Sequence, residues 1–159
     1  MVNVLDKVQP KNKTQLKSLI EYAFNHNIYD LNFIDTSKIT EMSNLFMNCE
    51  YDIDVSNWDV SNVTNTAGMF FYCKNLDCDL SKWNVSNVTN TAGMFYFCKN
   101  FDCDLSHWNV SNVKYMYLMF HNCKKFNSDM SNWNVTKAKS TLNMFNGCDK
   151  MTIPNWYKK

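Results

Sequence analysis

Two hydrophobic periodicities alternate along most of this chain. The first places apolar residues every three to four positions, which is the spacing of one face of an α-helix. Its clearest example is the set Val63, Thr66, Met69, Phe70 and Cys73. Thr64 stands where an N-cap residue would begin such a segment. The pattern predicts a short helical segment here and at each equivalent place along the chain.

The second periodicity is a strict alternation of apolar and polar residues. Leu76, Cys78 and Leu80 alternate with Asp77 and Asp79. Side chains of a β-strand point to opposite faces in turn, so this alternation indicates a strand with one buried face. Each unit of the pattern therefore predicts one short strand and one short helical segment.

Both patterns recur every 25 residues. The period is clearest in two columns of identical residues, which are Trp58, Trp83, Trp108 and Trp133, and Cys73, Cys98, Cys123 and Cys148. We divide a single domain, 1–159, into an N-terminal cap (1–30), five repeats (31–55, 56–80, 81–105, 106–130 and 131–150) and a C-terminal cap (151–159). In the truncated last copy, Trp156 can continue the tryptophan column.

Both ends of the repeat array carry candidate caps. Residues 14–25 place one apolar stripe on a predicted helix, made of Leu16, Leu19, Ile20, Ala23 and Phe24. Thr14 is the candidate N-cap of this helix and Pro10 lies just outside it. At the other end, Pro154 and the polar tail after it are expected to stop further strand pairing.

A repeat of 20 to 29 residues with one strand and one helical segment is typical of leucine-rich repeats. A single repeat has too few apolar side chains to offset the entropy of ordering it, so neighbouring repeats must stack. The predicted fold class is therefore α/β. We expect a right-handed, leucine-rich-repeat-like solenoid with a parallel strand and a helical segment in each repeat.

The segment LSKWNVSNVTNTAGMFYFCKNFDCDLSHWNVSNV resembles the repeats of BspA-type leucine-rich-repeat surface proteins. The resemblance covers about residues 10 to 157. It implies a solenoid that serves adhesion or protein binding, and it carries over no catalytic residues. The exported relatives begin with a signal peptide or a lipoprotein cysteine, whereas this chain shows neither. Such repeats also occur in gut bacteria and bacteriophages, where a free-standing copy could work inside the cell.

Composition and charge exclude several classes of function. The net charge is +1, and all 16 basic residues are lysines. Because arginine is the preferred residue for phosphates and guanine edges, a nucleic-acid partner is not expected. The chain has no apolar run of roughly 18 residues, so we expect no membrane span. With no signal peptide at its start, we expect the protein to be cytoplasmic.

The seven cysteines are the most conspicuous candidates for chemistry in the sequence. Cys49 extends the column of cysteines, and Cys78 and Cys103 occupy inward strand positions. Cys73 and Cys78, and likewise Cys98 and Cys103, have four residues between them, which could suggest a zinc site or a disulfide. Zinc sites more commonly have two residues between their cysteines, or histidines at regular offsets. We expect small structural hydrophobes, with no metal and no cofactor. No histidine or glycine-rich loop forms a catalytic pattern, so no enzymatic activity is expected.

Outward strand positions stack into two acidic columns. The first holds Asp52, Asp77 and Asp102, and the second holds Asp54, Asp79, Asp104 and Asp129. The second column could bond nearby backbone amides. Carboxylates stacked this closely repel each other, so something must compensate. The candidates are Lys74, Lys99 and Lys124 from adjacent turns, a basic partner, or a divalent cation.

The middle repeats carry extra aromatic residues on the helical face. These are Phe71, Tyr72, Tyr96, Phe97, Tyr115 and Tyr117. Because Phe70 and Cys73 already point inward, at least one of each extra pair must face out. The small residues at 67–68 and 92–93 would leave these rings exposed. A contiguous exposed aromatic patch marks an interface, unless the rings pack sideways between repeats.

These patterns favour a non-enzymatic protein-binding module that uses the aromatic patch, the acidic face, or both. One form of the hypothesis is an intracellular, phage-encoded inhibitor or decoy of a host protein. The alternative is a structural or adhesive surface component that binds host protein or glycan. The sequence leaves open whether the patch binds a foreign protein or forms a homodimer.

Overall fold

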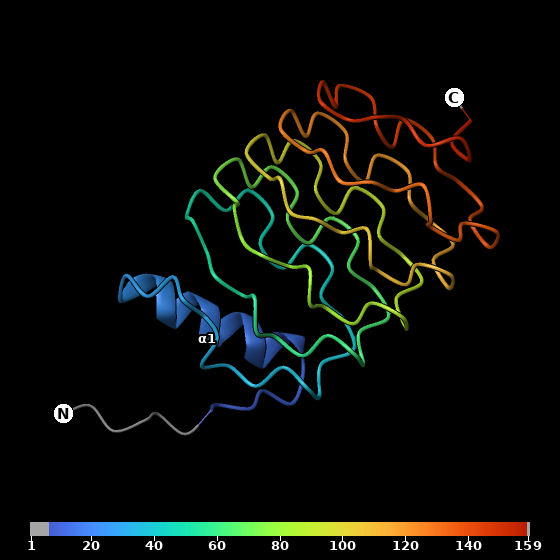
Figure 1. The fold of residues 1–159 in the computed structure, drawn as a ribbon. Coiled ribbons are helices and arrows are strands. Elements are labelled where there is room, and N and C mark those ends of the chain that lie inside the picture. Colours follow the sequence, from blue (N-terminus) through green and yellow to red (C-terminus); the bar gives the residue numbers. More distant parts are fainter. Residues whose placement is uncertain (1–6, 159) are drawn as a thin grey trace.

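A computed structural model describes residues 7–158 and shows the repeats as stacked coils of chain (Figure 1). Each coil takes about one repeat. Many of the hydrogen bonds between coils join residues 23 to 28 positions apart, such as that from the Met42 amide to the Asn65 carbonyl and that from the Trp83 indole to the Val55 carbonyl. Residues 1–6 of the expected N-terminal cap, and Lys159, lie outside the described residues.

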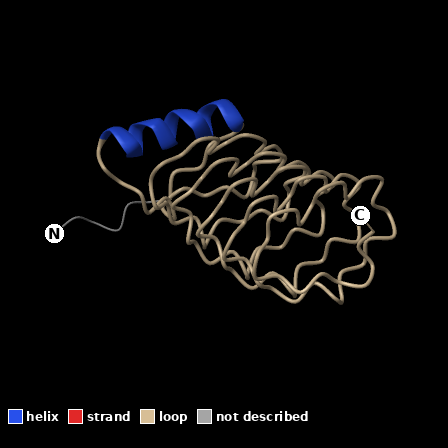
Figure 2. Cartoon of the chain, turned by 90° about the horizontal axis from the view of Figure 1, so that it is seen from above, coloured by secondary structure: helices blue, strands red, loops and turns tan. Residues whose placement is uncertain are grey.

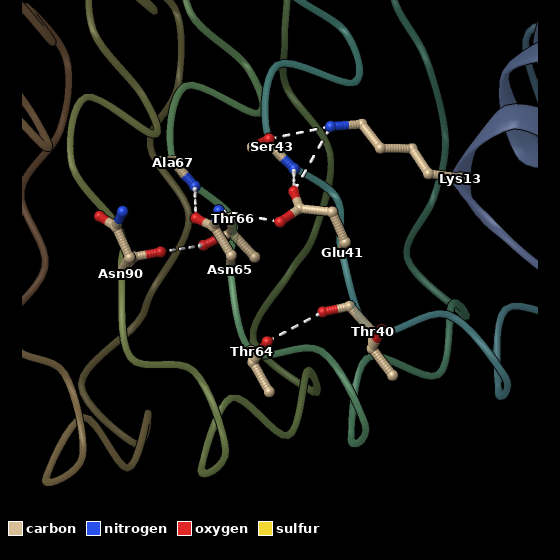
Figure 3. Close-up of polar contacts among 9 residues, drawn as sticks. All are labelled: Lys13, Thr40, Glu41, Ser43, Thr64, Asn65, Thr66, Ala67 and Asn90. Atoms are coloured by element: carbon tan, nitrogen blue, oxygen red, sulfur yellow. Dashed lines mark hydrogen bonds and ion pairs between the residues drawn. The ribbon is translucent and has the colours of Figure 1, made fainter.

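The helix α1, Lys13–Asn25, lies alongside the first coil (Figure 2). Its buried side chains are Leu16, Ile20 and Ala23, as the apolar stripe predicts. Its N-cap is Asn12 rather than Thr14, because the Asn12 Oδ1 accepts from the Gln15 amide at 3.0 Å. The ammonium of Lys13 donates to the Ser43 hydroxyl at 2.8 Å and ties the helix to the first coil (Figure 3).

The prediction of an α/β solenoid with a strand and a helical segment in each repeat is wrong. Among residues 7–158, α1 is the only helix and no residue belongs to a strand, so there is no sheet. Isolated parallel bridges connect the coils instead. The longest column of bridges joins Glu41, Asn65, Asn90, Tyr115 and Ser140, which lie in or next to the segments that were expected to be helical.

A ribbon of consecutive β-turns replaces the expected helical segment in each coil. In the second coil, the amides of residues 69, 71 and 73 bond to the carbonyls three positions earlier. The amides of residues 66, 68, 70 and 72 instead bond to carbonyls of the next coil at 2.7–3.0 Å. Every second peptide thus points along the stack. We call residues 41–49, 65–73, 90–98, 115–123 and 140–148 the turn ribbons.

Positive φ angles explain why these segments are turns. Gly68 and Tyr72 have φ of +62° and +61°, which an α-helix does not allow. A turn with its third residue at positive φ needs glycine or asparagine most often. The tandem turns still bury Thr66, Met69, Phe70 and Cys73, and they therefore imitate the spacing of a helix.

The predicted strand at residues 76–80 keeps its alternating burial but makes no ladder. Leu76, Cys78 and Leu80 are buried, and the two aspartates between them are exposed. Side chains intervene between the coils here. The Leu80 amide donates to the Cys103 Sγ at 3.2 Å, and the Val55 amide donates to the Cys78 Sγ at 3.4 Å. The thiols occupy the acceptor role that a neighbouring strand carbonyl would have in a sheet.

The core is a set of aromatic ladders that run along the stack. Five phenylalanines pack face to face with ring centroids 5.5–5.9 Å apart, namely Phe46, Phe70, Phe95, Phe120 and Phe145. Each tryptophan of the column donates its indole N–H to a carbonyl of the preceding coil. Trp156 does the same to Met130 at 2.7 Å, which confirms that it continues the column.

Candidate functional site

The extra aromatic residues lie on the turn ribbons of three successive coils, and ring contacts join those of the second and third coils to His121 on the fourth. We call this set of residues the aromatic stripe, and it consists of Phe71, Tyr72, Tyr96, Phe97, Tyr115, Tyr117 and His121. Phe71, Tyr96 and His121 occupy one position in successive ribbons, and Tyr72 and Phe97 occupy the next. Each coil repeats the backbone of the one before, so these five rings meet. Phe71, Tyr72, Tyr96 and Phe97 pair between the second and third coils, and Tyr115, Tyr117 and His121 lie on the fourth.

The rings of the stripe stack in two parallel rows. In the first row, Phe71 stacks on Tyr96 with centroids 4.5 Å apart, and Tyr96 stacks on His121 at 5.0 Å. In the second row, Tyr72 stacks on Phe97 at 4.7 Å. All three pairs are within about 10° of parallel, and such offset pairs stabilise by about 1 kcal/mol beyond the area that they bury.

The stripe is half-buried at one end and exposed at the other. The small residues do not leave the rings upright as expected, because a Cβ on Gly93 would lie 3.6 Å from the Phe71 ring. The ring of Phe71 therefore packs on the next coil, over Gly93 and against Tyr96. Tyr115 and Tyr117 stand out, with 39% and 42% of their surface exposed. Next to Tyr117 in the following coil, Leu142 is 64% exposed.

Two residues of the stripe occupy strained backbone positions. Tyr72 and Phe97 have φ of +61° and +60°. The equivalent residues of the other ribbons are Asn48, Asn122 and Gly147, which are the types that tolerate such angles. A bulky residue in this region costs on the order of 1–3 kcal/mol. Aromatic side chains are thus kept where the fold favours asparagine or glycine.

His121 is a member of the stripe that the sequence pattern missed. Its ring is half-buried against Tyr96 and Phe97. Its Nδ1 is buried and has no hydrogen-bond partner among the described residues. The signal was available, because His121 is 25 residues after Tyr96 and 50 after Phe71.

The aspartates of the second acidic column stabilise the turns that follow the predicted strand segments. The carboxylates accept from the backbone amide two residues later, Asp79 from Ser81 at 3.0 Å and Asp104 from Ser106 at 2.9 Å. The same contact is made by Asp54 and by Asp129. This confirms that the second column bonds nearby amides, in the manner of an Asx-turn.

Hydrogen bonding also sets the charge state of this column. The bonds from Ser81 lower the pKa of Asp79, and those from Ser106 lower the pKa of Asp104. For Asp54, burial alone would raise the pKa, but the bonds from Ser56, Asn32 and Cys78 outweigh it and the pKa is lowered. These carboxylates are therefore ionised over a wide pH range.

The first acidic column lies exposed beside shallow hollows between coils. One hollow of about 480 Å³ is lined on its acidic side by Asp77, Asp79, Asp102 and Asp104. Neither Lys74 nor Lys99 forms an ion pair within residues 7–158, and Lys124 pairs with Asp149 at 3.1 Å instead. In that same part of the chain, no cluster of ligating side chains could hold a metal ion.

All seven cysteines are free thiols, and four have a clear structural role. Cys73, Cys98, Cys123 and Cys148 are buried, and each donates to the carbonyl of a core phenylalanine in the preceding coil at 2.9 Å. Burial raises the pKa of Cys73 to about 12. The column therefore behaves as small packed side chains with a weak donor rather than as nucleophiles.

This chain is a repeat protein, as its stacked coils and its columns of tryptophans and cysteines show. The aromatic stripe distinguishes one face of the stack from the others. The chain belongs to the DUF285 family, described as Mycoplasma protein of unknown function, whose model matches residues 14–106 and 47–156. It is a BspA-like repeat-associated family, so the resemblance seen in the sequence holds at the level of the family. No curated protein and no solved structure matches the chain. Within residues 7–158, no helix is both long enough and apolar enough to span a membrane.

Proposed function

We propose that this protein is a non-enzymatic protein-binding module that docks a partner through the aromatic stripe. The observation that carries the proposal is the placement of Tyr72 and Phe97 at positive φ. Backbone strain persists where the surrounding structure compensates for it, and it concentrates at functional sites. Asparagine or glycine would fit both positions with less backbone strain, so the two aromatic rings are kept at a cost in backbone energy.

The chemistry of the stripe also suits a protein interface. Tyrosine and other aromatic residues are enriched at interface centres, because they add large contact area at a small cost in side-chain entropy. Stacking already fixes the rings of Phe71, Tyr72, Tyr96 and Phe97, so little freedom is lost on binding. Tyr115 and Tyr117 add two exposed rings on the next ribbon, and the Lys139 ammonium lies 6.0 Å from the centroid of the Tyr115 ring.

The proposal has a more specific form, in which the protein acts inside the cell as an inhibitor or decoy of a host protein. The resemblance to BspA-type leucine-rich-repeat proteins, whose repeats serve adhesion or protein binding, supports binding in general. It supports equally the runner-up function, an adhesive surface component that binds protein or glycan. The two forms differ in whether the complex is stoichiometric or multivalent.

The test compares the double variant Phe71→Ser, Tyr96→Ser with the control Tyr22→Ser. Tyr22 is an exposed tyrosine of α1, 57% accessible, that lies outside the stripe. Each protein is checked for folding and used to capture partners from cells that naturally make it. Light scattering under reducing conditions is run in parallel, to detect a homodimer.

We expect a stoichiometric partner that the wild type and Tyr22→Ser bind and that the double variant loses. A partner retained by the double variant would reject the stripe as the docking surface. A wild-type dimer that becomes a folded monomer in the double variant would assign the stripe to self-association. Binding on a glycan array, lost in the same variant, would favour the adhesive function.

A further inference from the structure

Glycine is favoured near the end of the fifth turn ribbon. Gly147 has a φ of +78°, and a Cβ built on it would overlap the side chain of Asn122 in the preceding coil. A larger residue would therefore be strained by its own backbone and by this neighbour. The residue before it is Asn146, and no other asparagine of the chain directly precedes a glycine.

The backbone amide of Gly147 lacks the hydrogen bond that holds its counterparts. The equivalent amides of the other four ribbons donate to carbonyls of the following coil at 2.7–2.8 Å, and they belong to Asn48, Tyr72, Phe97 and Asn122. Within residues 7–158, no ribbon follows the fifth, and the Gly147 amide has no acceptor. Gly147 and Asn146 both line an open hollow of about 330 Å³, so solvent reaches them.

The side chain of Asn146 is also unrestrained. It is exposed, and its carboxamide makes no hydrogen bond to the described part of the chain. At the same ribbon position, the inner coils carry Phe71, Tyr96 and His121, which have no carboxamide. Only the fifth ribbon therefore places a free carboxamide directly before an unbonded glycine amide.

Two other asparagines of the turn ribbons show the contrast. Asn143 is exposed in the same ribbon, but the amide that follows it, that of Met144, donates to the Thr141 carbonyl at 3.1 Å. The amide that follows Asn122 belongs to Cys123 and is bonded at 3.0 Å. A bonded amide cannot turn toward the neighbouring side chain without losing that bond, so these asparagines are protected.

We infer that Asn146 is a site of spontaneous chemical modification, at which the side chain cyclises onto the backbone and is converted to isoaspartate and aspartate. Asparagine is among the chemically labile residues. Hydroxide from the solvent removes the Gly147 amide proton, and the nitrogen attacks Cγ of Asn146. The N–Cγ bond forms and the Cγ–Nδ2 bond breaks, so ammonia leaves with a proton from water and a cyclic succinimide remains. Water then opens the ring at Cγ to give aspartate, or at the backbone carbonyl carbon to give isoaspartate.

The modification changes both the charge and the backbone of the fifth coil. Either product carries a carboxylate where Asn146 is neutral. Isoaspartate also lengthens the main chain by one methylene, at the residue whose carbonyl accepts from the Asn122 amide at 2.8 Å. The new charge lies one coil beyond His121, at the end of the row of rings. The inference does not depend on the proposed function, because the reaction requires no partner.

The test follows the mass of the reduced full chain during incubation at about pH 8. Replacement of a carboxamide by a carboxyl group raises the mass by a known increment, and peptide mapping locates the change. Methylation by an isoaspartate-specific methyltransferase measures the isoaspartate. Asn146→Gln should react far more slowly, because a longer side chain must close a larger ring. Asn155→Gln makes the same change at an exposed asparagine outside the ribbon and is the matched control.

We expect Asn146 to be modified at least about tenfold faster than any other asparagine, and faster as the pH rises, because the attacking amide must lose its proton. Isoaspartate and aspartate should both form, and Asn146→Gln but not Asn155→Gln should abolish the change. Earlier modification elsewhere, for example at Asn127 before Ser128, would overturn the proposal, as would aspartate formed without isoaspartate. A folded chain that stays intact while the urea-unfolded chain is converted would show that the ribbon protects Asn146, and would also overturn it.

Discussion

The strain at Tyr72 can be measured by comparing alanine with glycine at the same position. Both Tyr72→Ala and Tyr72→Gly remove the ring and its stack on Phe97, so the difference between them reports on the backbone alone. Tyr72 has a φ of +61°, whereas Tyr96, a neighbouring ring of the same surface, is not among the residues with positive φ. The pair Tyr96→Ala and Tyr96→Gly is therefore the matched control.

The expected magnitudes follow from the cost of a Cβ at positive φ. A left-handed conformation costs an L-residue with a Cβ about 1–2 kcal/mol, whereas glycine has no such cost. At positions with negative φ, glycine makes the folded protein less stable than alanine does by about 0.5–1 kcal/mol, because a glycine loses more conformational entropy on folding. Glycine should therefore be more stable than alanine by about 0.5–1 kcal/mol at position 72, and less stable by a similar amount at position 96.

Urea unfolding followed by tryptophan fluorescence measures both differences, because four of the five tryptophans are buried in the folded protein. The preference between alanine and glycine should change sign from position 72 to position 96. Alanine favoured at both positions would refute the strain, and it would remove the observation on which the proposed function rests.

Three further predictions concern the core and the acidic face. Trp83→Phe removes the indole N–H that bonds to the buried Val55 carbonyl at 3.1 Å, and should cost about 1–3 kcal/mol in urea unfolding, whereas a change below about 0.5 kcal/mol would count against the ladder. Hydrogen bonds lower the pKa of Asp79 and of Asp104, so their contribution to stability should be complete above about pH 5. It should be lost as the pH falls from there through the lowered pKa values, which thermal melts from about pH 2 to 7 can show, and a melting temperature that does not fall over this range would contradict the role of these bonds. Burial raises the pKa of Cys98 well above its usual range, so this thiol should react with a thiol reagent at pH 8 only after unfolding, and fast labelling of the native protein would contradict its packing.

The sequence was a good guide to which residues are buried and which repeat. The 25-residue period, the tryptophan column through Trp156 and the helix near residues 14–25 all appear in the structure. The side-chain amides of Asn62, Asn87 and Asn112 follow the same period, and each donates to a carbonyl of the preceding coil. These features depend on side-chain type and spacing, which the sequence states directly.

The secondary structure could not be predicted in the same way. Tandem turns bury Thr66, Met69, Phe70 and Cys73 at the same spacing as a helix does, so periodicity cannot separate the two. The only local signal was Gly68, and the bulky Tyr72 at the second positive φ angle concealed it. At residues 76–80, the alternation was real, but Cys78 and Cys103 provide acceptors where a sheet would use carbonyls.

The central structural claim is that alternate peptides of each turn ribbon point along the stack, and amide hydrogen exchange tests it most directly. In inner coils, we predict protection of both sets of amides, including residues 116, 118, 120 and 122, which bond to the fifth coil. In the fifth ribbon, the amides of residues 144, 146 and 148 should be protected, and those of 141 and 143 should exchange freely. Continuous protection from 143 to 148 would indicate a helix and would contradict the account.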